Sequence, residues 1–167
     1  MKFTSLTNEE KTSSGGFTHR LDFSYRDIAA GIASNTATTY STTFLPSLPI
    51  SSFVAKTELH LTTPFQDASD SALNSTTISF GDTTTATRFI NASEANVNGT
   101  EVLNVVPGAV TNAIYTAAGQ LLLTINSMTN KVISNLDVGQ AYILVEIHCA
   151  HDPARTHASP FLTNGLT

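Results

Sequence analysis

The sequence has few charged residues and lacks several residue types that other protein classes depend on. Of its 167 residues, 13% are charged, with 8 Lys and Arg against 13 Asp and Glu, and there is one Cys and no Trp. Eight basic residues in an acidic chain cannot easily form the positive stripe that neutralises phosphates, so a nucleic-acid partner is disfavoured. The single Cys149 excludes a small domain built on disulfides.

Long hydrophobic runs are also missing. No stretch approaches the roughly 20 apolar residues of a membrane-spanning helix, and the best candidate, residues 141–147, has the length of a strand. Residues 1–16, MKFTSLTNEEKTSSGG, contain two Glu and no apolar run of the kind found in a signal peptide. We therefore expect no membrane partner, and synthesis in a cytoplasm, where the lone thiol stays reduced.

Small uncharged polar residues are abundant instead. The chain has 26 Thr, 17 Ser and 12 Asn, about a third of its length. Thr is β-branched and suits a pleated surface, and its hydroxyl keeps that surface wet without adding charge. Such a surface fits an ordinary β-protein equally well, but another protein can also cover it at modest desolvation cost, because interface cores are depleted of charge.

The hydrophobic pattern predicts an all-β fold. Alternation begins at Phe17, and turn signals separate eight or nine short candidate strands. These are residues 17–25, 37–44, 53–61, 76–80, 88–90, 101–106, 121–125 and 141–147. Only residues 27–33 and 109–118 resemble helical turns. This pattern is typical of an antiparallel β-sandwich, jelly-roll-like, of about eight strands.

Three regions follow from the same pattern. Residues 1–16 are expected to form a flexible N-terminal arm, residues 17–151 the sandwich, and residues 152–167 an irregular C-terminal tail. Within the sandwich, residues 53–61 are expected to place Phe53, Ala55, Thr57, Leu59 and Leu61 inward, leaving Lys56, Glu58 and His60 in solvent.

Few residues suggest catalysis or metal binding. His148, Cys149 and His151 crowd three potential ligands into four positions, with His60 or His157 as a further ligand. In a strand, however, these side chains alternate between faces and do not converge. Asp67, Asp70 and Asp82 suit turn and loop capping, and no nucleophile elbow, phosphate loop or HExxH motif is present. We expect no enzyme activity, no cofactor and no metal, and a metal-dependent enzyme is the weakest alternative.

The order of the short motifs resembles the layout of small jelly-roll virion proteins of tailed bacteriophages. The resemblance covers residues 17–148. It is carried by Tyr25-Arg-Asp-Ile28, the Thr-rich residues 37–44, Leu45-Pro46 with Pro49, residues 53–61, Thr63-Pro-Phe65, residues 76–80, Gly81-Asp82, Arg88-Phe89, residues 115–119, residues 121–125, Leu136-Asp-Val-Gly139 and residues 141–147.

The resemblance implies a capsid decoration or cement protein on the outside of the phage head, commonly a homotrimer. Its partners would be the major capsid protein and copies of itself, and its location the capsid surface of the virion. Candidate subunit contacts are Phe3 and Leu6 in the arm and Phe161 and Leu162 in the tail. The alternative is a tail or spike protein that binds a host receptor or glycan through its longest loops, residues 62–75 and 82–99.

Overall fold

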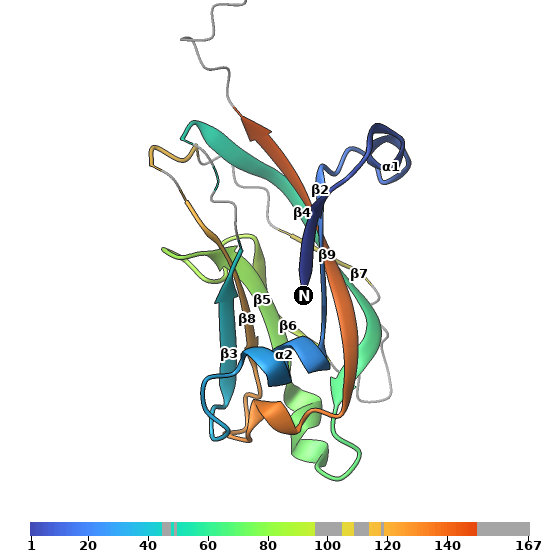
Figure 1. Ribbon diagram of the computed structural model, residues 1–167, viewed down its shortest axis with the longest axis vertical. Helices are drawn as coiled ribbons and strands as arrows, with labels where there is room; N and C mark the ends of the chain where they lie inside the picture. Colours follow the sequence, from blue (N-terminus) through green and yellow to red (C-terminus); the bar gives the residue numbers. More distant parts are fainter. Residues whose placement is uncertain (45–47, 49, 96–104, 109–113, 118, 150–167) are drawn as a thin grey trace, which may run out of the picture.

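The computed structural model describes residues 1–44, 48, 50–95, 105–108, 114–117 and 119–149. Two antiparallel sheets lie face to face (Figure 1). One contains, in spatial order, β1 (Lys2–Ser5), β2 (His19–Ser24), β9 (Val138–Cys149), β4 (Ser52–Gln66) and β7 (Val105–Pro107). The other contains β3 (Thr39–Thr43), β8 (Leu121–Asn126), β5 (Thr77–Asp82) and β6 (Ile90–Glu94).

The strand order is that of a jelly roll. When β1 is set aside, the eight strands β2 to β9 divide into the sheets β2-β9-β4-β7 and β3-β8-β5-β6. Successive strands therefore cross from one sheet to the other, except β5 and β6, which pair within one sheet, as in a pair of Greek keys folded together. The predicted sandwich of about eight strands is confirmed, and β1 extends the first sheet by one strand at the edge of β2.

Short helices occupy the connections. They are α1 (Asn8–Ser13), α2 (Tyr25–Gly31) and the 3₁₀ turns η1 (Ser71–Ser75) and η2 (Ile133–Asn135). The helical turn predicted near residues 27–33 corresponds to α2, and most of the one predicted at 109–118 lies outside the described residues. No helix in the described ranges is long and apolar enough to span a membrane.

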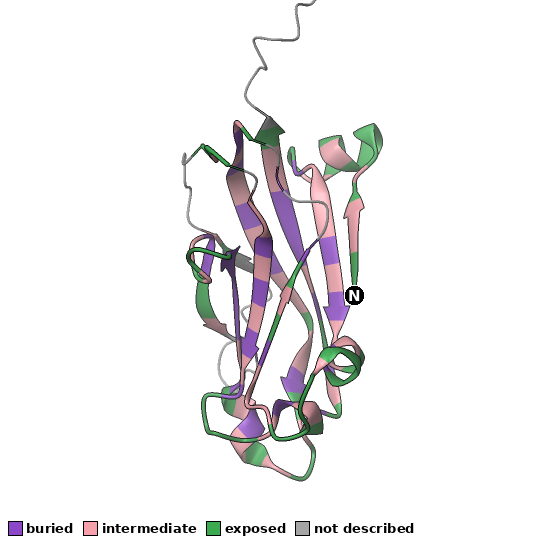
Figure 2. Cartoon of the chain, turned by 60° about the vertical axis from the view of Figure 1, so that its left-hand side comes forward, coloured by how far each residue is buried: buried purple, intermediate pink, exposed green. Residues whose placement is uncertain are grey.

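The core fills the space between the two sheets. Buried side chains alternate along the strands, as the purple segments in Figure 2 show. Each sheet contributes a row of large side chains that are almost fully buried, among them Leu21, Leu59 and Ile143 from one sheet and Phe80 and Leu123 from the other. This alternation explains why the sequence pattern identifies the strands correctly.

The inward face predicted for β4 is wrong at its beginning. Pairing between β4 and β9 shifts register between Val54 and Lys56, which marks a β-bulge. As a result Val54 is buried, at 2% exposure, whereas Phe53 stacks on the ring of His148, with centroids 5.2 Å apart. Beyond the bulge the prediction holds, since Thr57 and Leu59 are buried and Glu58 and His60 are only partly so.

Both termini were expected to lie outside the sandwich. The N-terminal segment forms β1 and α1, and β1 pairs with β2 from Lys2 opposite Asp22 to Ser5 opposite His19. The flexibility expected of residues 1–16 stays a prediction. The tail predicted at residues 152–167, with Phe161 and Leu162, lies outside the described residues.

Candidate functional site

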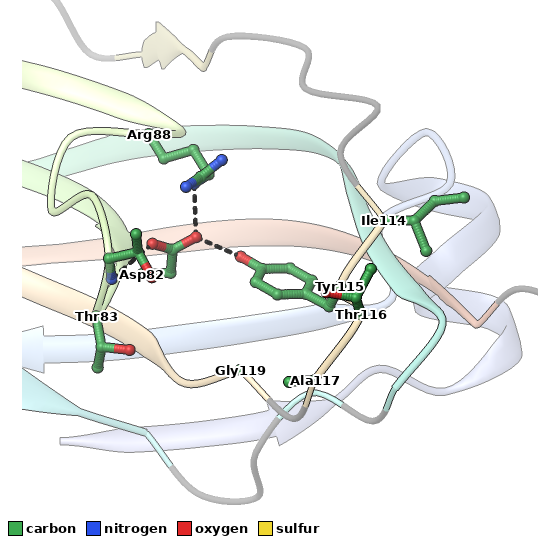
Figure 3. Close-up of a pocket in the computed structure, with 9 residues that line it drawn as sticks. Asp82, Thr83, Arg88, Ile114, Tyr115, Thr116, Ala117 and Gly119 are labelled. Atoms are coloured by element: carbon green, nitrogen blue, oxygen red, sulfur yellow. Dashed lines mark hydrogen bonds and ion pairs between the residues drawn. The ribbon is translucent and has the colours of Figure 1, made fainter.

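A buried carboxylate organises one end of the sandwich. Asp82, at the end of β5, is 2% exposed. Its Oδ1 accepts hydrogen bonds from the backbone N–H groups of Thr84 (2.9 Å) and Thr85 (2.7 Å). Its Oδ2 accepts a hydrogen bond from the Tyr115 hydroxyl (2.7 Å) and forms an ion pair with Arg88 Nε (2.6 Å), as Figure 3 shows. Asp82 thus joins the turn after β5 to the segment after β7.

The cavity beside this cluster encloses about 260 Å³. Asp82, Arg88, Tyr115 and Gly119 are among the lining residues. Burial and the bond to Asp82 raise the pKa of Tyr115 well above its usual range, so the phenol stays protonated and acts as a donor. Both carboxylate oxygens have partners and the Asp82 charge is offset by Arg88, so the cluster suits loop positioning better than acid–base catalysis.

A second group of polar residues crosses the outer face of the five-stranded sheet. Tyr142 of β9 lies between neighbouring strands, with the Arg20 guanidinium 3.9 Å from its ring centroid. The His60 ring stacks on Tyr142 at 4.5 Å with an interplanar angle of 7°. Because β2 and β4 flank β9 on opposite sides, the two residues cover opposite faces of the Tyr142 ring. We call Arg20, Tyr142 and His60 the cross-strand stack.

Ion pairs continue the cross-strand stack at both ends. Arg20 pairs with Asp22 at 2.6 Å, and Glu58 pairs with both His60 (3.3 Å) and Lys56 (2.9 Å). These pairs are partly exposed, so each stabilises the fold by at most about 1 kcal/mol. The charged groups on this face are therefore largely matched with one another.

A shallow cavity of about 390 Å³ lies between the cross-strand stack and the N-terminal segment. Leu6, Glu10 and Leu144 line it together with the three residues of the stack. Both faces of Tyr142 are already covered, so the ring offers no platform on which a sugar could stack.

The outer face of the four-stranded sheet is chemically different. The register places nine outward residues of β3, β8 and β5 in three rows, and none of the nine is charged. Ser79 and Gly81 of β5 are nevertheless buried, and β6 places Glu94 opposite Thr77 at the end of the first row. The rows are Thr39–Asn126–Thr77, Ser41–Thr124–Ser79 and Thr43–Leu122–Gly81. We call these nine residues the threonine face. In its central row the hydroxyls of Ser41 and Thr124 lie 3.1 Å apart and form a hydrogen bond.

The structure separates the predicted metal ligands that it describes. His148 forms a pair with Glu146 at 2.6 Å, and His60 pairs with β9 at Tyr142, six residues away along that strand. Six residues of strand span about 20 Å. His151 and His157 lie outside the described residues, and no group of three potential metal ligands occurs among those that are described.

The predicted contact residues have distinct positions. Phe3 packs against the core and stacks on His19, whereas Leu6 lines the cavity beside the cross-strand stack. The expected capping roles are confirmed, because Asp67 accepts from the Ser69 N–H, Asp70 from the Ala72 N–H, and Asp82 from two N–H groups of its turn.

Sequence reasoning did not identify the Asp82 cluster or the cross-strand stack. Asp82 and Tyr115 are 33 residues apart, and Arg20 and Tyr142 are further apart still. Strand pairing brings Arg20 and Tyr142 together, and backbone hydrogen bonds to residues 51 and 52 hold the segment that carries Tyr115. Residues 56, 58, 60 and 142 alternate with apolar neighbours, and this alternation indicates that they share the outer face of the sheet. It does not indicate which residues of neighbouring strands lie opposite one another.

Comparison with known proteins gives a structural similarity but no family. No protein-family profile and no curated protein matches the chain. A solved structure described as "Cyanophage Pam1 capsid asymmetric unit" contains a chain that is 17% identical to this one, with a TM-score of 0.48. The alignment covers 78% of this chain and 81% of that chain.

Proposed function

We propose that the protein is a structural component of a bacteriophage particle, a decoration protein that binds the outside of the capsid and stabilises it. The threonine face is the observation that carries the proposal. It presents uncharged residues of three strands, mostly hydroxyl side chains together with Asn126, Leu122 and Gly81, on the opposite side of the sandwich from a face whose charges are matched with one another. A large partner covers such a face at low desolvation cost.

The proposal includes the major capsid protein as partner and a homotrimer as the form that binds. A permanent contact of this kind buries on the order of 2,000 Å² or more, which a three-strand face and its neighbouring loops supply only when several copies act together. The polar clusters in the described residues support a role without catalysis, because the carboxylates of Asp82 and Glu58 are each held by two or more partners within the fold.

Binding to undecorated capsids tests the proposal. The purified protein would be mixed with shells of the phage that encodes it, and the bound fraction measured by sedimentation and by cryo-electron microscopy. We expect saturable binding and shells that withstand higher temperature. Failure to bind shells, together with binding to host cells or glycans, would instead establish the receptor-binding alternative.

A matched pair of variants locates the contact surface. Ser41→Lys places a charge in the central row of the threonine face, where Ser41 is exposed, and is expected to abolish or weaken shell binding at least tenfold. Thr12→Lys places the same charge on the exposed α1 and is expected to bind as the parent does. Equal binding by both variants would remove the threonine face from the proposal.

A further inference from the structure

The edge of β2 carries a strand that the jelly roll itself does not require. Strands β2 to β9 complete both sheets, and β1 adds a fifth strand through four residue pairs with β2. Without β1, the edge of β2 would present unpaired N–H and C=O groups, which other strands can pair with. The edge of β2 is therefore a slot that can accept a strand, and Lys2–Ser5 occupies it.

Side-chain contacts make the slot specific for this sequence. The Phe3 ring stacks on His19 at 5.2 Å and approaches Phe44 of the opposite sheet at 6.0 Å. Phe3 thus closes the gap between the two sheets beside β2, and it packs against the core as a partly buried side chain. Any chain that presents the same four residues would make the same contacts.

The connection between β1 and β2 is weakly held to the rest of the fold. The helix α1 has no buried residue and is closed by a local capping box between Thr7 and Glu10, with distances of 2.8 and 3.3 Å. Gly15 and Gly16 follow with φ angles of 78° and 98°, and a side chain at either position would meet nothing within 4 Å. Residues 6–16 therefore contain no buried residue and end in a hinge of two glycines, whereas Phe17, at 1% exposure, and Thr18, whose N–H donates to Val145 O, anchor the chain to the fold.

The link is also long enough to reach a neighbour. Eleven residues, 6–16, lie between Ser5 and the anchored Phe17, and when extended they span roughly 36 Å, comparable to the width of a small domain. Opening α1 breaks only local hydrogen bonds, since none of its residues is buried. The hydrogen bonds of β1 itself are recovered in full on the β2 edge of a second copy.

We infer that β1 is exchanged between copies of this chain, so that Lys2–Ser5 of one subunit pairs with β2 of the next and its Phe3 stacks on His19 of that neighbour. In the closed arrangement β1 pairs with β2 of its own chain, and in the exchanged arrangement it pairs with β2 of another copy. Both arrangements make the same contacts at β2, so the local concentration of other copies decides between them. A short flexible link holds its own strand at an effective concentration of millimolar order. Exchange therefore competes when copies are held together at about that concentration, as in an oligomer or an assembled shell.

The inference concerns contacts between copies and does not require the capsid. If shell binding fails, exchange can still be detected in the purified protein. If exchange fails, the threonine face can still bind shells.

Paired cysteine variants detect the exchange directly. Lys2 and Asp22 are opposite each other across β1 and β2, and directly opposed strand residues are spaced suitably for a disulfide. In a Cys149→Ser background, a chain carrying only K2C would be mixed with a chain carrying only D22C. The mixture would be incubated at about 1 mM, where exchange competes with closure, and then mildly oxidised.

A disulfide between the two chains requires that the arm of one lie on β2 of the other. The control mixes K2C with S41C, whose thiol lies on the outer face of the opposite sheet. We expect a reducible heterodimer from K2C and D22C, at several times the yield of the control, with the linked peptides identified by mass spectrometry.

A single chain that carries both substitutions tests whether cysteines at positions 2 and 22 can form a disulfide. At about micromolar concentration, far below the range in which exchange competes with closure, K2C/D22C is expected to close its own disulfide and remain a monomer, which confirms that the two positions can be joined. If this variant forms its internal disulfide while the mixed chains give no more dimer than the control, the exchange of β1 is ruled out.

Discussion

The ring of Phe3 lies flat against the imidazole of His19, with centroids 5.2 Å apart and planes 4° apart. The two residues belong to adjacent strands and lie two positions out of register, on the same face of the sheet, because Phe3 pairs with Leu21 and His19 with Ser5. Their stacking fastens an edge strand through side chains as well as backbone hydrogen bonds. The N-terminal strand is therefore part of the fold, although its connecting helix is not buried.

Truncating Phe3 is expected to loosen β1 selectively. Phe3→Ala removes the stack on His19 and the contact with Phe44, at a cost of about 1–2 kcal/mol for a partly buried aromatic side chain. Hydrogen exchange should become faster at the backbone amides of β1, while amides of β8 in the opposite sheet keep their protection. Equal loss of protection in both strands would mean that Phe3 supports the whole sandwich. Thr7→Ala, which removes only the cap of α1, is the control.

Protonation of His19 is expected to weaken the fold in mildly acidic solution. Burial lowers the pKa of the His19 imidazole from its usual 6.5, and the nearby positive charge of Lys11 lowers it further. Between the lowered pKa and about 6.5 the unfolded chain binds more protons than the folded one. The stabilisation is therefore fully present above pH 6.5 and is lost as the pH falls from 6.5 through the lowered pKa.

Urea unfolding at pH 7.5 and at pH 5 measures this dependence. His19→Asn, which cannot titrate, should show a smaller loss of stability between the two pH values than the parent does. His148→Asn is the matched control, because His148 lies on the outer face and is exposed. An unchanged pH dependence in His19→Asn would assign the effect to other groups.

The contacts of Asp82 predict that substituting this one residue lowers the stability of the fold by a large amount. Asp82→Ala leaves two N–H groups, the Tyr115 hydroxyl and Arg88 without their acceptor, and is expected to cost about 3 kcal/mol. Tyr115→Phe removes one hydrogen bond to a buried charge and is expected to cost about 2 kcal/mol. Asp67→Ala, at an exposed turn, should cost less than about 1 kcal/mol. Thermal unfolding of the three variants checks the order, and a mild effect at Asp82 would contradict it.

Local sequence pattern was sufficient to predict most of the strands. Period-two alternation at residues 17–25 indicates a strand with one buried face, and the short apolar run at residues 121–125, which follows Gly119, indicates another strand; these correspond to β2 and β8. Turn chemistry was equally readable, since Asp70 and Asp82 cap the turns in which they occur. Both signals depend on interactions within a few residues, which is why the sequence alone shows them.

The pairing of strands that are distant in the sequence could not be predicted from local pattern. β1 carries a single large apolar residue, Phe3, and becomes a strand only because β2 offers an open edge. The cross-strand stack depends on the register of three strands that are distant in the sequence. In the same way, the threonine face gathers residues whose abundance is obvious in the composition, but whose common orientation follows only from the pairing of β3, β8 and β5.

The bulge in β4 gives a prediction that distinguishes the two possible phases of this strand. Val54 is 2% exposed, so Val54→Ala is expected to cost about 2 kcal/mol through lost burial and the cavity that remains. Phe53→Ala removes only the stack on His148 at the outer face and is expected to cost about 1 kcal/mol. Regular alternation without the bulge would reverse this order, because Phe53 would then fill the core and its truncation would cost roughly 3–5 kcal/mol. Chemical denaturation of the two variants decides between the phases.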